Sequence, residues 1–260
     1  MFKWFFKFGL TMFFTQFKFS RSHWIIFLIW LGLFGSNGWG IDDRAIAQSI
    51  AIDGTLGQAV PLTGPIYMIP PQVGQSIGKN LFHSFGQFNL ATGEAAVFQS
   101  TPEIRNILAR VTGGIPSTID GLIATESGNV NLFLMNPSGI AFGPNASLNI
   151  GDATRGSFVA TTLDAIVFPN GGQFRATNPG DASSLLTIVG DPSGFLAAQR
   201  LSQPITLTGS RLGVFGGQSL LLVGGDIILD NSLRGLSSNG TGSYAKAKSR
   251  AGRAFQKPFF

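Results

Sequence analysis

The side chains that could do chemistry are few and scattered along this chain. Its only histidines are His23 and His83, and it has no cysteine. His83 has no cysteine partner and no histidine three or four residues away, so a metal site or a histidine-activated nucleophile has little to build on. We therefore expect His83 to line the wall of the fold, and we assign no catalytic, cofactor-binding or metal-binding residue and no enzymatic activity.

Carboxylates are the other route to catalysis. Enzymes that cleave glycosides place two carboxylates on either side of the bond that breaks. Here Asp152, Asp164, Asp181 and Asp191 occur singly, each beside Gly, Ala, Leu or Pro. A capping role in a turn explains each of them. A surface protein that binds or cleaves carbohydrate is the alternative function, with surface glycans as its ligands.

Phosphate and nucleic-acid binding are disfavoured by spacing and by charge. Residues 74–80 resemble a phosphate-binding loop, but the glycine spacing is one residue short and no Ser or Thr follows Lys79. Residues 48–240 carry eleven acidic and eight basic side chains, a net charge of −3. A nucleic-acid-binding domain is expected to carry a basic face, so we expect no nucleic-acid partner.

Short apolar runs separated by turns dominate residues 129–150. The residue before a proline is extended, so Asn136 ends a strand. Pro137 presets its own φ, and Gly139 accepts a positive φ at little cost. Strands turned this often predict a solenoid in which each coil is buried by its neighbours. The runs are residues 130–135, 140–142 and 148–150, and the turns are residues 136–139 and 143–145.

Comparable apolar runs recur toward the C-terminus. They predict strands at residues 157–161, 165–168, 185–189, 205–207, 212–215, 220–223 and 227–229. Residues 169–180 are rich in Gly, Pro and Asn, so we expect an excursion from the solenoid around Phe174. Earlier in the chain we expect a bend near Gly86, with Phe85 and Phe88 in the core.

Several of these segments together resemble the secretion domain of filamentous-haemagglutinin-like exoproteins, the two-partner secretion (TPS) family. That family carries Asn-Pro-Asn-Gly-Ile/Leu after an apolar strand. Here the motif reads Asn136-Pro137-Ser138-Gly139-Ile140, with serine in place of the second asparagine. A serine hydroxyl makes similar turn bonds more weakly. The resemblance extends from about residue 53 to residue 229 and includes residues 80–85, 111–114, 156–162 and 220–226.

The resemblance implies both a fold and a function. The expected fold is all-β, a right-handed single-stranded parallel β-helix of the pectin-lyase-like kind, with residues 48–78 as an N-terminal cap. The expected function is secretion targeting of a large exoprotein or adhesin. The implied partner is an outer-membrane β-barrel transporter with periplasmic domains, and Asn136 to Ile140 would be the secretion motif. The product would be secreted or held at the cell surface after crossing the periplasm and outer membrane.

Residues 101–114 fit two structures. Thr101 could cap a helix with Pro102 in its first turn, and the following apolar residues recur at helical spacing. The resemblance instead implies a solenoid strand in which Ile107, Ala109 and Val111 point inward. We predict the strand.

Residues 1–47 have the three parts of a signal peptide. Lys3, Lys7, Lys18 and Arg21 precede an apolar run at residues 25–34. Ala45 and Ala47 match a cleavage site before Gln48, so the inner-membrane export machinery is an expected partner. The alternative is a membrane anchor, although Ser, Asn and Gly dilute a span that needs about 20 apolar residues.

Three regions follow from this division. We expect a signal peptide at residues 1–47, a TPS domain at 48–236 and a basic tail at 237–260. The tail loses the apolar pattern, is predicted to be disordered and resembles a truncated end. Its five basic residues also leave a binding role open; they are Lys246, Lys248, Arg250, Arg253 and Lys257.

Overall fold

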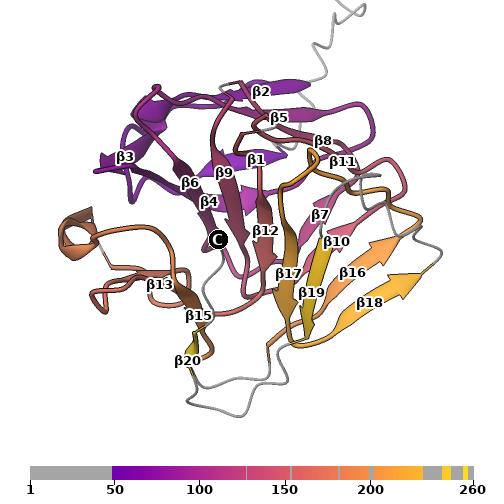
Figure 1. Cartoon of the computed structure of the whole chain (residues 1–260). Coiled ribbons are helices and arrows are strands. Elements are labelled where there is room, and N and C mark those ends of the chain that lie inside the picture. The colour runs from indigo at the N-terminus through magenta and orange to yellow at the C-terminus, as the bar shows by residue number, and fades with distance from the viewer. Residues whose placement is uncertain are drawn as a thin grey trace, which may run out of the picture. The chain divides into compact units, whose positions relative to one another are not determined.

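A computed structural model describes residues 49–126, 128–152, 154–180, 182–198 and 202–230, and the backbone of 242–246 and 254–256. Its strands wind into a parallel β-helix of about six turns (Figure 1). The predicted all-β, parallel β-helical fold is therefore confirmed. The expected signal peptide, with Ala45, Ala47 and Gln48 at its cleavage site, lies outside the described residues.

The largest wall of the β-helix is the first sheet, in which six strands pair in parallel. Each successive strand comes from the next coil of the chain. Parallel strands covered on both faces are expected to be apolar almost throughout, and β6 and β9 are buried at every position. The six strands are β4 (Asn80–Phe88), β6 (Asn106–Val111), β9 (Asn131–Met135), β12 (Phe158–Thr161), β17 (Leu220–Gly224) and β19 (Gly242–Lys246).

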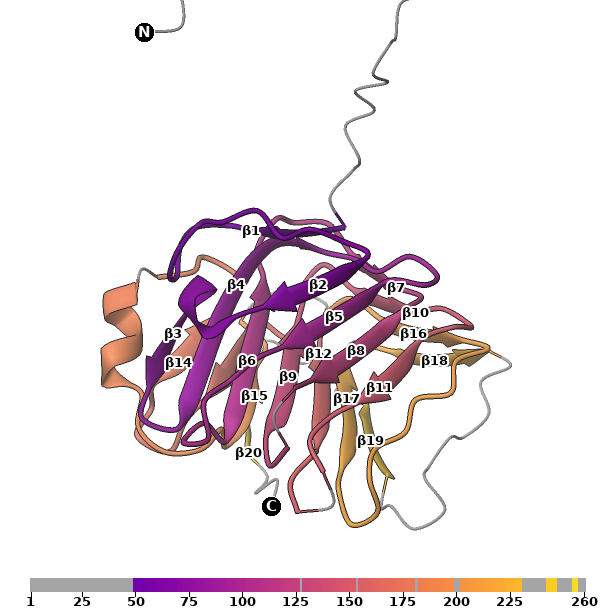
Figure 2. The same cartoon turned by 90° about the horizontal axis from the view of Figure 1, so that it is seen from above.

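Two smaller parallel sheets form the other walls (Figure 2). One coil runs through β6, β7 (Ser117–Ile119) and β8 (Leu122–Thr125) before the chain returns to the first sheet at β9. The second sheet consists of β2 (Ile66–Ile69), β5 (Ala95–Phe98), β8 (Leu122–Thr125) and β11 (Ser147–Asn149). The third sheet consists of β7 (Ser117–Ile119), β10 (Ile140–Phe142), β16 (Ile205–Thr208) and β18 (Ile227–Asp230).

The N-terminal residues cover the first edge of the β-helix, as the expected cap would. Strand β1 (Ile50–Ile52) pairs antiparallel with one half of β4, and β3 (Gly74–Ile77) pairs antiparallel with the other half. A short 3-10 helix, η1 (Pro71–Val73), precedes β3. The ladder between β1 and β4 skips Gly86, the position at which a bend was predicted. Because β4 is paired on both sides, its backbone groups are not left open to other chains.

An excursion leaves the solenoid after β12 and returns at β16. We use this name for residues 163–198, which contain β13 (Ala165–Val167), β14 (Gln173–Arg175), the 3-10 helix η2 (Ala182–Thr187) and β15 (Gly194–Leu196). These strands form an antiparallel sheet that β20 (Ala254–Gln256) extends. The predicted excursion, residues 169–180 around Phe174, is part of this larger unit.

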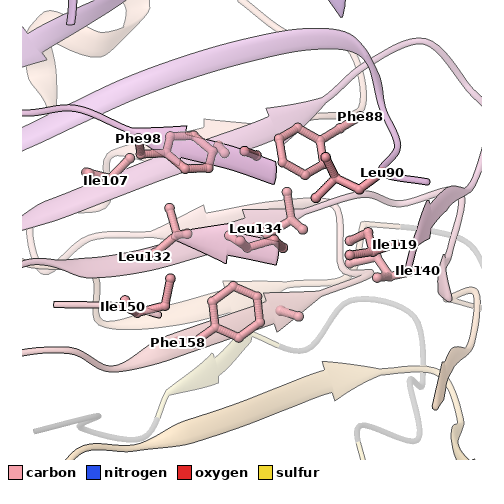
Figure 3. Packing of buried hydrophobic residues seen from close by; sticks show 14 of the residues in the cluster. Phe88, Leu90, Phe98, Ile107, Ile119, Leu132, Leu134, Ile140, Ile150 and Phe158 are labelled. Carbon is pink, nitrogen blue, oxygen red and sulfur yellow. The ribbon is translucent and has the colours of Figure 1, made fainter. Parts of the chain in front are cut away.

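Side chains from all three sheets meet inside the β-helix (Figure 3). Phe85 and Phe88 belong to this interior, as predicted. So do Ile107, Ala109 and Val111, which confirms the strand interpretation of this segment. Leu108 is buried on the opposite face of the sheet, among residues of the excursion. Because both faces of this strand are covered, apolar residues occur on both of them. Their spacing in the sequence therefore resembles that of a helix.

Two predicted strands are wrong. Residues 185–189 contain the end of η2, where the Ile188 amide donates to the Leu185 carbonyl at 2.9 Å. That turn buries Leu185 and Ile188 on one side and leaves no extended run. Residues 212–215 form no strand, although Leu212 is buried in the interior. A short apolar run indicates burial but does not by itself show that the segment pairs with another strand.

His83 lies inside the β-helix, as predicted for a wall residue. Its side chain is fully buried, with ring centroids 5.7 Å from Phe98 and 6.1 Å from Phe85. Neither ring nitrogen makes a hydrogen bond of good geometry with the described residues. Burial lowers the pKa of His83 to about 4, and the backbone of Val73 offsets only part of this shift.

We predict that acid destabilises the folded domain through His83. The unfolded chain binds this proton with an ordinary pKa of 6.5, and the folded chain does so only near 4. Stability is therefore complete above pH 6.5 and falls as the pH drops toward 4, by about 2 kcal/mol between pH 6.5 and 5. Urea unfolding of residues 48–260 at several pH values measures this loss.

His83→Leu is the control, because it keeps an apolar side chain of similar size without a titrating group. Its stability should be nearly constant from pH 7 to 5. Asp53, Asp120 and Asp152 have lowered pKa values, so their contributions disappear only at lower pH. The same loss in both proteins between pH 7 and 5 would show that His83 is not the cause.

Candidate functional site

The candidate secretion motif forms the corner between β9 and β10. Asn136 follows the last residue of β9, and the Gly139 amide donates to its carbonyl at 3.1 Å. Gly139 has a φ of +118°, whereas Ser138 is not among the residues with positive φ. A negative φ at the third position excludes a type II turn and fits a type I turn, with proline second and glycine fourth.

The Asn136 side chain forms hydrogen bonds within this corner and with the preceding coil. It is fully buried. Its Oδ1 accepts the Ser138 amide at 2.9 Å, which closes an Asx turn. Its Nδ2 donates to the carbonyl of Ile115 and to Oγ of Ser117, both at 3.0 Å. Asn136 thereby satisfies backbone and side-chain groups that the corner would otherwise leave unpaired.

Backbone hydrogen bonds hold the motif between the coils before and after it. The Asn136 amide donates to the Thr161 carbonyl at 2.9 Å, and the Ser117 amide donates to the Gly139 carbonyl at 3.0 Å. Asn136, Gly139 and Ile140 are buried, and Pro137 and Ser138 are half-buried. The structure therefore brings all five motif residues together, but the folded motif offers little surface to a partner.

At a second corner, polar side chains from three coils form hydrogen bonds with one another. Asp120 accepts the Asn145 amide at 2.8 Å and its Nδ2 at 3.0 Å, and it also accepts the hydroxyl of Thr92. Hydrogen bonds from Thr92 and then from Asn145 lower the pKa of Asp120. These contacts support a structural role for Asn145 in the turn at residues 143–145. Sequence reasoning missed Thr92 and Asp120, which lie in other coils.

An asparagine ladder marks the start of the first sheet's strands. Nδ2 of Asn106 donates to Oδ1 of Asn80 at 2.9 Å, and Nδ2 of Asn131 donates to Oδ1 of Asn106 at 3.1 Å. Oδ1 of Asn131 in turn accepts the Ser157 amide at 3.2 Å. The signal for this ladder in the sequence is the recurrence of Asn 26 and then 25 residues apart.

The aspartates considered for carbohydrate chemistry accept structural hydrogen bonds at three separate places. Asp152 accepts the amides of its own turn, and hydrogen bonds from Thr154 lower its pKa. Asp164 accepts the Ala198 amide, and Asp191 accepts Nδ2 of Asn106. Asp181 lies outside the described residues. Within the part of the chain that is described, no three His, Cys, Asp or Glu side chains are grouped to hold a metal.

A capped parallel β-helix with an asparagine-proline corner and a docked excursion defines a class of solenoid domain. The chain belongs to the TPS secretion domain family, whose sequence pattern matches residues 48–254. Domains of this family target exoproteins for two-partner secretion and are not enzymes. No curated protein matches the chain. None of the helices in the described residues is long and apolar enough to cross a membrane.

The family match continues beyond residue 236, at which the sequence placed the end of the domain. In this region β19 pairs in parallel with β17. The boundary at residue 236 and the disorder of the remaining tail residues stay predictions.

Replacing Asn136 by Ala should lower the free energy of unfolding by about 2–4 kcal/mol, because it removes a buried amide with three hydrogen bonds. Ser138→Asn, which restores the residue of the family motif, should change it by about 0.5 kcal/mol or less. Urea unfolding at neutral pH measures both values. Equal losses in the two variants would show that the Asn136 contacts are not what holds the corner.

Proposed function

We propose that residues 48–236 are the secretion-targeting domain of a large exoprotein or adhesin and are recognised by an outer-membrane β-barrel transporter. The inner-membrane machinery delivers the chain to the periplasm, and the leader is removed before Gln48. The transporter's periplasmic domains then bind the chain, which passes through the outer membrane and is released or held at the cell surface. The family assignment supports this route.

The burial of Asn136 is the observation on which this proposal rests. In the folded domain its amide is fully buried and engaged in three hydrogen bonds. A transporter that reads this side chain has to meet it before the coils close. The motif therefore acts in the unfolded chain as a recognition signal and in the folded chain as a corner.

The edges of the folded domain support recognition before folding. Strand addition to a partner's sheet needs an extended segment with free backbone groups. In the folded domain β4 is paired on both sides. β2, at the edge of the second sheet, has only four residues, and Pro65 and Pro70 flank it. Short strands and prolines limit pairing at an edge, whereas the unfolded chain offers many longer segments.

Folding outside the cell would favour export in one direction. The strands of the first sheet from β4 to β17 bury side chains on both faces, against the interior and against the excursion. Burial of apolar surface stabilises by about 25 cal/mol per Å². A chain that folds on the far side of the membrane loses the ability to slide back, so folding would draw the remaining chain outward.

Asn136→Ile should abolish export in cells that carry the partner transporter. The amount of chain in the medium and in the periplasm, measured by immunoblot, gives the result. The substitution keeps a side chain of similar size but removes the amide. Unchanged export of this variant would overturn the role of the motif.

Ser117→Ala separates recognition from stability. It removes one hydrogen-bond partner of Asn136 and weakens the folded corner by about 1 kcal/mol, but leaves the motif intact. We expect normal export of this variant, and also of Ser138→Asn. If export instead declines with folded-state stability in both Ser117→Ala and Asn136→Ile, the motif acts through the fold and is not read by the transporter.

A further inference from the structure

The outer face of the first sheet carries a cluster of apolar side chains, and the excursion covers it. In Figure 2 the strands of the excursion lie behind this sheet. The ring of Phe82 on β4 lies 5.0 Å from that of Phe174 and 6.2 Å from that of Phe168. The same buried cluster includes side chains from four further strands of the sheet: Leu108, Phe133, Met135, Val159, Leu221 and Val223.

Polar contacts fix the excursion on the sheet at two places. At the start of the strands, Nδ2 of Asn80 donates to the Gly190 carbonyl, and Nδ2 of Asn106 donates to Oδ1 of Asp191, both at 2.8 Å. Further along β6, Nη1 of Arg110 donates to the Arg175 carbonyl at 2.8 Å. The Arg110 guanidinium also lies 4.9 Å from the centre of the Phe174 ring.

Arg110 joins the excursion to the cap as well as to the sheet. It is 1% exposed. Its Nε donates to Oγ of Ser84 at 2.7 Å, and Nη2 donates to Oγ1 of Thr55 at 3.1 Å. Both hydroxyls donate to Asp53. Burial lowers the pKa of Arg110 to about 10, with Asp53 opposing the shift, so the side chain is charged at neutral pH. Its contacts are complete only when cap, coils and excursion are all in place.

This arrangement differs from an ordinary solenoid. In a simple stack each coil contacts only its neighbours, so folding can begin in one part and spread. Here one segment of the chain packs across successive coils and also contacts a residue that bonds to the cap. Coils without the excursion would expose the outer face of the first sheet to water.

We infer that the excursion is a folding clamp, which couples the coils of residues 80–161 into one cooperative unit that closes only after residue 198 is available. For a chain leaving a transporter, the early coils would then stay open until the excursion emerges. This last step depends on the proposed function, whereas the coupling itself is a property of the isolated domain.

Hydrogen exchange of the purified chain from Gln48 onward tests the coupling, followed by mass spectrometry at increasing low denaturant concentrations. We expect amides of β4, β6 and β9 to open in the same event as those of β13 and β15. Phe174→Ala removes the side chain that touches Phe82 and Arg110. It should lower protection in β4 and β6 by about a hundredfold or more and make the excursion open first.

Phe142→Ala is the matched control. Phe142 is equally buried, but it lies in the interior on β10 and does not belong to the cluster beneath the excursion. This variant should lower protection throughout while the single opening event is kept. If Phe174→Ala does not fold, Phe174→Leu serves as the smaller change and is interpreted in the same way.

Two results would overturn the clamp. One is independent opening of β13 and β15 in the unaltered chain, with β4 and β6 still protected. The other is a loss of protection in Phe174→Ala that is confined to the excursion. Either result would leave the export function standing, since that function is tested by Asn136→Ile with the transporter present.

Discussion

The pairing of each strand with the strand one coil earlier is the interaction on which the structure depends. In the first sheet this pairing runs without interruption from β4 to β19. It satisfies backbone groups that would be costly to bury unpaired, and it places like side chains above one another. The asparagine ladder from Asn80 to Asn131 reinforces the register at the start of three of these strands. The corners and the excursion are arranged around this stack.

Under the proposed function, Asn136 would serve two states of the chain with one side chain. In the folded state Asn136 is a corner residue whose amide leaves no free hydrogen-bonding surface. A role as a signal, as proposed, would therefore belong to the chain before folding. Such a separation in time would let a buried residue be both structural and recognised.

Local patterns in the sequence predicted most of the coil strands and the position of the corner after residue 135. The prolines and glycines at Asn136–Ile140 specified a turn, and the apolar runs on either side specified strands, because these signals act over a few residues. Contacts between distant coils were not predictable in this way. Arg110 appeared as an ordinary polar residue, yet it bonds to Thr55 and to the Arg175 carbonyl. The strand predicted at residues 185–189 failed because Leu185 and Ile188 are buried by a docked loop and not by a ladder.

The antiparallel cap over β4 gives the stack a polarity. Strands β1 and β3 occupy the edge at which a preceding coil would pair. At that edge β4 therefore has no free side on which a preceding coil could pair. The cap thus closes one edge of the domain to pairing. β18 is the last strand of the third sheet, and its side chains Ile228 and Leu229 are 49% and 45% exposed. A coil added at the opposite end would take its strand register from the last coil.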